Sequence, residues 1–563
     1  MALDLVVRGG TLVDGSGAPC EVADVGVVGD RIVAVGSVQG EAAVEIEADG
    51  LLVTPGFVDV HTHYDGQATW ASSLSPSAEH GVTTVVTGNC GVGFAPCRPD
   101  DRRRLVQLME GVEDIPEAVM TAGLSWDWES FPEFLDSLDR RRFDMDVAVQ
   151  LAHAPLRVFA MGERALVRQP ASADDVAVMR SLARQALEAG AIGFSTSRSL
   201  NHKAIDGSLI PSYGAAGDEL AGIAEALADT GTGVLQLISD FDDVDAEFAV
   251  VRRMAERSGR PVSVTILQFA HAPDRWRQVL DQIEAAVADG LAVRGQVCGR
   301  PVGLMMGLDF SRNPFMGTDA YREVAGLPVD ERLAALRVPA RRQAILEQFP
   351  GTLPGSAALF STFTTMFPFE GAASYEPGPG DSVAARAEAT GCDPAAYAYD
   401  HLTAGDGTGV LYVPVANYAG RTTEVIEEML TSDVTILGLG DGGAHCGLIC
   451  DASLPTYMLE RWSDAGRGTI PLAEVVKWLT ADAAAAVGLD DRGVLAAGKR
   501  ADLNVVDPSS LRLAPPEMVH DLPDGGGRIR QAAGGYVATV VAGQVTRRDG
   551  QPTGALPGRL VRG

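Results

Sequence analysis

Short apolar runs alternate with helix-like patterns through the middle of this 563-residue chain. Apolar runs of this length, bounded by turn residues, indicate buried strands, and about eight strand–helix units are the count of a closed parallel barrel. The predicted strands are residues 56–60, 83–87, 146–151, 191–195, 233–238, 262–268, 292–296 and 435–438, and the predicted helices include 174–189, 219–228, 245–257, 274–289 and 472–485.

The two chain ends and one internal segment have a different pattern. Residues 1–54 and 490–563 carry short β-rich runs between Gly and Asp turns, which predicts one small β-sandwich assembled from both termini. The α/β barrel is predicted for residues 55–489. Within it, residues 300–410 are rich in Gly, Pro and aromatic residues, and we predict an inserted, lid-like segment over the barrel mouth.

Two histidines stand directly after the first predicted barrel strand, in the sequence GFVDVHTHYD. His61 and His63 are two residues apart, and residues i and i+2 of an extended chain point to the same side. In barrels the functional residues lie at this carboxyl end of the strands. The two imidazoles can therefore bind one cation together. The alternative interpretation is that both histidines are polar loop residues without a metal.

Two further candidates follow the second and the last predicted strands. Cys90 lies in a Gly-flanked loop, where a thiolate could bind zinc, while a small apolar residue in a tight loop is an equally good interpretation. Asp441 follows the last strand and could bind the metal and accept a proton from its bound water. An isolated Asp-Gly pair indicates a turn, so only its place after a barrel strand makes Asp441 a candidate.

Five segments stand in this order along the chain: GFVDVHTHYD, HGVTTVVTGNCG, LAHAPLR, EAGAIGFST and GVLAAGKRAD. Together they resemble the amidohydrolase superfamily, and within it the N-acyl-D-amino-acid deacylases, the D-aminoacylase-like branch. The resemblance covers about residues 5–545 and is weakest across 300–410. It implies a metal-dependent (β/α)8 barrel with a small β-sandwich, and hydrolysis of a C–N amide bond, here that of an N-acyl-amino acid.

The resemblance also implies a role for each candidate residue. His61 and His63 match the ligand pair of the first strand, Cys90 matches the deacylases' cysteine ligand, and Asp441 matches the aspartate that binds metal and shuttles the proton. Zinc lowers the pKa of bound water toward about 7 and polarises the carbonyl. A carboxylate then carries the proton to the leaving nitrogen.

The chain departs from the deacylases at two ligand positions. Deacylases present a histidine after the fifth strand and another after the sixth. Here Ser239 and Asp240 follow the fifth predicted strand, and Gln268 stands near the end of the sixth, with His271 a few residues later.

A two-metal site built in the usual way is therefore not expected. No lysine falls at a barrel strand end early enough to serve as a carbamylated bridging ligand. We predict one Zn²⁺ per chain, or another divalent metal, held by His61, His63 and Asp441. Cys90 is then either a fourth ligand or a vestige.

Three more residues are candidates for contact with the substrate. His153 follows a predicted strand, and Arg157 lies just beyond it. Arg157 could pair with a substrate carboxylate, or it could close a structural ion pair, which is the role we favour. His445 lies four residues past Asp441 and could contact the substrate or orient Asp441.

Composition limits the partners. A net charge of −30 and a pI near 4.6 argue against nucleic acid or an anionic membrane surface. We expect a small-molecule substrate, with a homo-oligomer as an option. No secretory signal or apolar run of transmembrane length is visible, and seven scattered cysteines suit a reducing cytoplasm.

Three functions compete. The leading one is a metal-dependent amidohydrolase acting on an N-acyl-amino acid, and the second is the opening of a cyclic amide or imide by the same groups. The third is a barrel that has lost catalysis and serves as a binding protein, which the two missing histidines support. Retention of His61, His63 and Asp441 together counts against that third function.

Overall fold

Eight parallel strands form the centre of the computed structural model, which describes residues 2–351, 355–369 and 375–563. Each of the eight predicted apolar runs overlaps one of them. They pair in chain order, and most of their residues are buried, as expected of strands covered on both faces. The strands are β6 (Phe57–Asp59), β7 (Val82–Thr87), β8 (Asp146–Ala152), β9 (Gly193–Arg198), β10 (Val234–Ser239), β11 (Val262–Ile266), β12 (Val293–Val297) and β16 (Thr435–Leu437).

The sheet curls so that its two edges meet at the carboxyl ends of the strands. The Asp441 amide donates to the His61 carbonyl at 2.9 Å, and the His63 amide donates to the Gly442 carbonyl at 2.8 Å. These bonds join the loop after β6 to the loop after β16. The arrangement fits a (β/α)8 barrel, and it brings residues from the two ends of the barrel sequence side by side.

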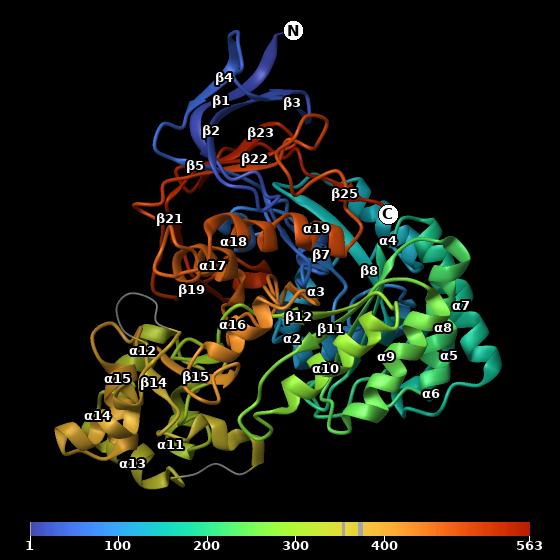
Figure 1. Cartoon of the computed structure of the whole chain (residues 1–563). Helices are drawn as coiled ribbons and strands as arrows, with labels where there is room; N and C mark the ends of the chain where they lie inside the picture. The colour runs from blue at the N-terminus through green and yellow to red at the C-terminus, as the bar shows by residue number, and fades with distance from the viewer. Residues whose placement is uncertain (1, 352–354, 370–374) are drawn as a thin grey trace.

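Helices cover the outside of the curled sheet, as Figure 1 shows for α7 to α10. One predicted helix, 472–485, is two helices, because Thr480 has non-helical backbone angles and its hydroxyl donates to the Val476 carbonyl. The helices are α1 (Gln67–Trp70), α2 (Arg102–Glu113), α3 (Glu117–Gly123), α4 (Phe131–Asp139), α5 (His153–Met161), α6 (Glu163–Leu166), α7 (Ala173–Glu188), α8 (Gly217–Thr230), α9 (Val244–Ser258), α10 (Arg275–Ala288), α16 (Glu424–Leu430), α17 (Leu454–Arg461), α18 (Leu472–Leu479) and α19 (Ala481–Ala486).

Both chain ends contribute strands to a second, nine-stranded sheet with a shared apolar core. The strand pairing defines this one sheet, and the two-layered sandwich stays a prediction. Its strands are β1 (Leu3–Leu12), β2 (Glu21–Val28), β3 (Arg31–Gly36), β4 (Ala42–Glu47), β5 (Leu52–Pro55), β17 (Leu503–Val506), β22 (Tyr536–Val541), β23 (Gln544–Arg548) and β24 (Gln551–Pro552).

The C-terminal residues depart from the predicted domain boundary. Strand β25 (Leu560–Val561) pairs in parallel with β8, so the last residues extend the barrel sheet and do not belong to the sheet of the chain ends. Between the two sheets run short paired strands: β18 (Arg512–Leu513) with β21 (Ala533–Gly534), and β19 (Glu517–Val519) with β20 (Arg528–Arg530).

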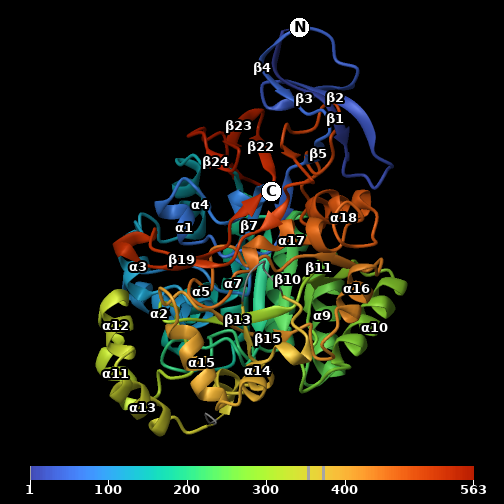
Figure 2. The same cartoon turned by 90° about the vertical axis from the view of Figure 1, so that its left-hand side faces the viewer.

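The segment predicted as an insertion has its own apolar core and a three-stranded sheet. Figures 1 and 2 place it at the end of the molecule opposite the sheet of the chain ends. Residues 352–354 and 370–374 of this segment lie outside the described residues. Its elements are β13 (Val302–Met306), α11 (Asp319–Ala325), α12 (Val329–Leu336), α13 (Pro339–Gln348), β14 (Phe367–Pro368), α14 (Val383–Thr390), α15 (Pro394–Thr403) and β15 (Leu411–Ala416).

Within the described ranges, no helix has both the length and the apolar character needed to cross a bilayer.

Candidate metal centre

His61 and His63 lie just past β6 and are buried almost completely. Their rings are 5.5 Å apart between centroids. The Asp441–His61 and His63–Gly442 backbone bonds fix this segment against the loop after β16. The imidazoles therefore stand in fixed places at the carboxyl end of the barrel, as their spacing predicted.

Cys90 joins them from the loop after β7. Its backbone is left-handed, with φ of 54°, and its amide donates to Gln236 Oε1 at 3.2 Å. The thiol Sγ lies 3.3 Å from His61 Nε2. One ligand atom from each of Cys90, His61 and His63 lies within 4.8 Å of the others, a spacing that suits one shared cation.

Asp441 completes the cluster from the loop after β16. Its Oδ1 lies 3.5 Å from His61 Nε2 and 3.8 Å from His63 Nε2. Leu439, Asp441 and His445 all have positive φ in this loop. Non-glycine residues in that region are held by their surroundings, and such conformations concentrate at functional sites.

Two neighbours that the sequence analysis missed orient the histidines. Gln296 Oε1 lies 2.7 Å from His61 Nδ1, and Gln296 Nε2 donates to Ser263 Oγ at 3.3 Å. This contact places the His61 proton on Nδ1 and leaves Nε2 free to bind a metal. Glu113 Oε1 faces the second histidine at 3.4 Å from His63 Nδ1, without a hydrogen bond between the two atoms.

The electrostatics of the cluster fit a bound cation. Burial lowers the pKa of His61 to about 4, so this imidazole is neutral, as a ligand must be. Burial, helped by the carboxylates of Asp451 and Asp59, raises the pKa of Asp441. His63 Nδ1 and Glu113 Oε1 are buried and make no hydrogen bond in the part of the chain that the structure describes. A divalent cation would compensate these crowded carboxyl groups.

The cluster lies on the wall of a cavity of about 200 Å³. His445 lines it, with Nε2 3.6 Å from Glu113 Oε2. His202 also lines the cavity, and its Nδ1 lies 2.7 Å from Ser197 Oγ. Much of the remaining wall is apolar: Ile238, Phe241, Ile266, Leu267, Phe269, Trp276, Val279, Val302, Val415, Ala416, Leu439 and Ile449.

The residues that replace the deacylases' other two histidines do not supply ligands here. Ser239 lines the cavity, but its hydroxyl donates to Glu247 at 2.9 Å. Gln268 is buried outside the cavity wall, where its side chain bonds the Pro273 carbonyl and the Ala419 amide. His271 is exposed beside Phe269. Neither Ser239 nor Gln268 therefore belongs to the group formed by His61, His63 and Cys90.

His153 and Arg157 lie away from this cavity. Arg157 Nε donates to Glu219 Oε1 at 2.7 Å, and His153 Nε2 lies 3.1 Å from the same oxygen. Arg157 also donates to the carbonyls of Pro211 and Gln169. All three side chains are buried, so the placement favours the structural ion pair and not the contact with substrate.

Arg157→Met should therefore lower the free energy of unfolding by about 3–5 kcal/mol, because it leaves the buried Glu219 carboxylate without its guanidinium. Arg252→Met, which breaks a surface pair with Asp289, should change stability far less. Denaturant titration measures both. An Arg157 variant of normal stability with a raised KM would instead make Arg157 a substrate-binding residue.

Two buried histidines, a cysteine and an aspartate at the carboxyl ends of barrel strands define a metal-dependent barrel protein. The sequence pattern of the Amidohydrolase family matches residues 44–547. The chain belongs to that family, which confirms the resemblance drawn from its five motifs.

The D-aminoacylase of Alcaligenes xylosoxydans xylosoxydans is 32% identical over 289 residues, or 51% of this chain and 55% of that protein. The match thus spans about half the length of this curated relative. A D-aminoacylase structure has a TM-score of 0.67 at 23% identity. That enzyme has a binuclear metal centre in which one metal activates and the second attenuates. The N-acyl-D-glutamate deacylase of Bordetella bronchiseptica, complexed with zinc and a phosphonate inhibitor, has a TM-score of 0.66 at 23% identity. Both structural matches cover 100% of both chains and show a shared fold.

Proposed function

We propose that this chain is a hydrolase that cleaves the acyl–nitrogen bond of an N-acyl-amino acid and works with one divalent metal ion, zinc being the first choice. The observation that carries the proposal is the buried group of His61, His63 and Cys90 beside Asp441, on the wall of a cavity. Family membership and the names of the relatives support the reaction class.

Each residue has a defined task in this proposal. His61, His63 and Asp441 would hold the metal, with Cys90 as a weaker fourth ligand. The bound ion would polarise the acyl carbonyl and lower the pKa of the attacking water toward about 7. Asp441 takes the proton from that water and gives it to the leaving nitrogen, because it is the carboxylate that faces both histidines.

The neighbouring residues hold this arrangement in place. Gln296 accepts the Nδ1 proton of His61, and Glu113 faces Nδ1 of His63, so each imidazole presents Nε2 to the metal. His445 Nε2 lies 3.6 Å from Glu113 Oε2. His445 also lines the cavity, where it can contact the substrate.

The number of metal ions per chain tests whether the site is mononuclear or binuclear. We expect about one zinc per chain in protein purified without added metal, because neither β10 nor β11 ends in a ligand that faces the cluster. Elemental mass spectrometry measures this number. Two ions per chain would contradict the single site, and no ion, with no gain on adding zinc back, would favour the non-catalytic barrel.

A substrate panel tests the reaction class. The zinc-loaded protein should release acetate from N-acetyl-D-amino acids, and chelation should stop the release. Dihydrouracil and hydantoin in the same panel test the opening of cyclic amides and imides. Hydrolysis of the cyclic compounds alone would make that reaction the function of the site.

Three other expectations stay predictions: the two-layered sandwich of the chain ends, a cytoplasmic location and a homo-oligomer. The seven cysteines are free thiols in the described ranges, which supports a reducing compartment.

A further inference from the structure

Arg275 is the one arginine or lysine among the described residues that line the cavity. The other basic side chains there are histidines, and His61 and His63 are already assigned to the metal. Any anionic substrate that enters the cavity therefore meets a single permanently charged cation.

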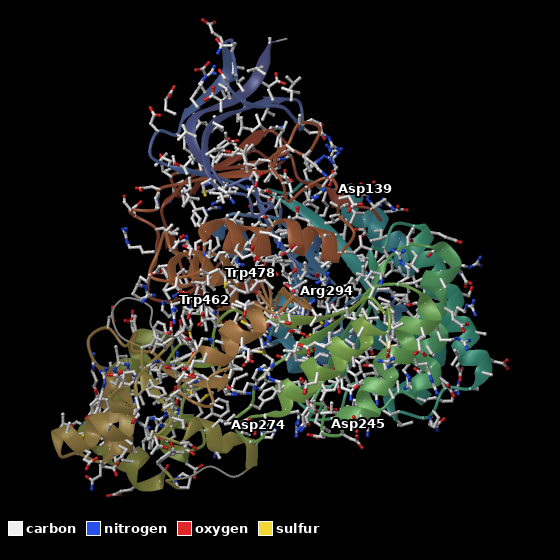
Figure 3. All side chains as sticks on the ribbon, viewed as in Figure 1. Asp139, Asp245, Asp274, Arg294, Trp462 and Trp478 are labelled. Atoms are coloured by element: carbon white, nitrogen blue, oxygen red, sulfur yellow. The ribbon has the colours of Figure 1, made fainter. Side chains whose placement is uncertain are left out.

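Arg275 is the first residue of α10, which follows β11. Asp274, labelled in Figure 3, marks this start of the helix at the lower edge of the barrel in that view. Trp276 and Val279 of the same helix line the same cavity. The helix therefore places Arg275 on the part of the wall that belongs to β10 and β11.

One edge of the guanidinium is unused. NH1 donates to the Asp240 carbonyl at 2.9 Å and lies 2.8 Å from an Asp242 carboxylate oxygen. Nε and NH2 make no hydrogen bond within the described parts of the chain. The Asp242 side chain is 66% exposed, so water weakens that ion pair. The Nε–NH2 edge matches the two oxygens of a carboxylate.

The other charged group on this part of the wall does not compete for that edge. Asp240 Oδ1 accepts from Ser199 Oγ, and Oδ2 accepts from the Leu200 amide, both at 2.6 Å. Only the backbone carbonyl of Asp240 contacts Arg275. This is also the part of the barrel where the residues after β10 and β11 supply no metal ligand.

We propose that Arg275 binds the carboxylate of the substrate through its Nε–NH2 edge. This inference rests on the proposed function and deepens it: Arg275 is the residue that recognises the carboxylate on the nitrogen-bearing side of the scissile bond. The guanidinium supplies a fixed positive charge on the wall of the cavity that His61 and His63 also line.

The test compares three variants of the zinc-loaded protein on two substrates. N-acetyl-D-leucine carries the carboxylate, and N-isopentylacetamide is the same molecule without it. Arg275→Gln should raise KM for the acid on the order of 10- to 100-fold, the effect of losing a charged hydrogen bond, and leave the amide unchanged. Arg252→Gln is the matched control, since its side chain is similarly exposed, at 28% against 22%, and lies outside the cavity.

Asp242→Asn distinguishes an anchor from a structural ion pair. If Arg275 binds the carboxylate, removal of the Asp242 charge leaves KM for the acid unchanged or lower. If the Arg275–Asp242 pair only stabilises the loop, Asp242→Asn and Arg275→Gln lose activity alike on both substrates, and the proposal is overturned.

Failure of the proposed function is separable from failure of this inference. If the wild type hydrolyses neither compound, isothermal titration calorimetry measures the binding of N-acetyl-D-leucine to each variant instead. Binding that is lost in Arg275→Gln and kept in Arg252→Gln supports the anchor without catalysis. Equal binding by both variants, or no binding by the wild type, overturns it.

Discussion

Asp441→Asn is expected to lower kcat by about 10³-fold or more while leaving the fold and its melting temperature essentially unchanged. Proton transfer by a positioned carboxylate contributes roughly 10²- to 10⁴-fold, and Asp441 is also a metal ligand in the proposed site. An amide cannot carry the proton from water to the leaving nitrogen. Because burial already disfavours the charged carboxylate, the neutral isostere is not expected to destabilise the protein.

Steady-state kinetics with zinc present in excess measures this effect, and circular dichroism measures the fold. Asp240→Asn is the control, since it removes a carboxylate from the same cavity. Within the described residues the oxygens of that carboxylate bond Ser199 and Leu200 and no other group. We expect a loss of less than about tenfold for that variant, the effect of one weakened hydrogen bond. Unchanged turnover in Asp441→Asn would remove Asp441 from the mechanism.

The barrel could be predicted because its strands are local signals. Strands buried on both faces give uninterrupted apolar runs, and all eight were placed within a few residues of their observed bounds. Tertiary contacts decided the misses. The 472–485 helix breaks where the Thr480 side chain bonds the carbonyl of Val476, and Leu560–Val561 joins β8 across more than 400 residues of sequence.

The same distinction holds in the metal centre. His61, His63, Cys90 and Asp441 each lie within four residues of the end of a barrel strand. Their positions after predicted strands were therefore enough to predict that they lie at the same end of the barrel. Glu113 ends a helix that carries no motif, and its partner His63 lies 50 residues earlier, so no local signal marks it.

Gln296 could have been noticed, because it is a polar residue at the end of a predicted barrel strand. Arg275 had no comparable signal, since a charged residue at a helix start is ordinary on any surface. His153 also follows a strand, but the buried Glu219 carboxylate binds it away from the cavity. A position after a barrel strand therefore does not decide a role in this site, and Glu113 and Arg275 reach the cavity from helices.

The second large effect concerns the metal. His61→Ala should weaken zinc binding by more than about 100-fold, beyond the 10- to 100-fold typical of residues that only orient a ligand. Its Nε2 faces Cys90 and Asp441, and Gln296 fixes its proton on the other nitrogen. The ring is neutral before zinc binds, so no proton must be removed.

Cys90→Ala should weaken zinc binding less than His61→Ala does, although the sulfur lies close to His61. Burial, with the carboxylates of Glu113, Asp441 and Asp65, raises the pKa of the thiol, and a thiol must lose its proton before it binds zinc. That deprotonation offsets part of the strength of the zinc–sulfur bond. Competition with a chromophoric chelator gives both affinities, and Gln296→Leu provides the comparison for a residue that only orients His61. Equal losses in the histidine and cysteine variants would show that Cys90 binds the metal as strongly as His61 does. The site would then share its cysteine ligand with the deacylases, although it lacks two of their histidines.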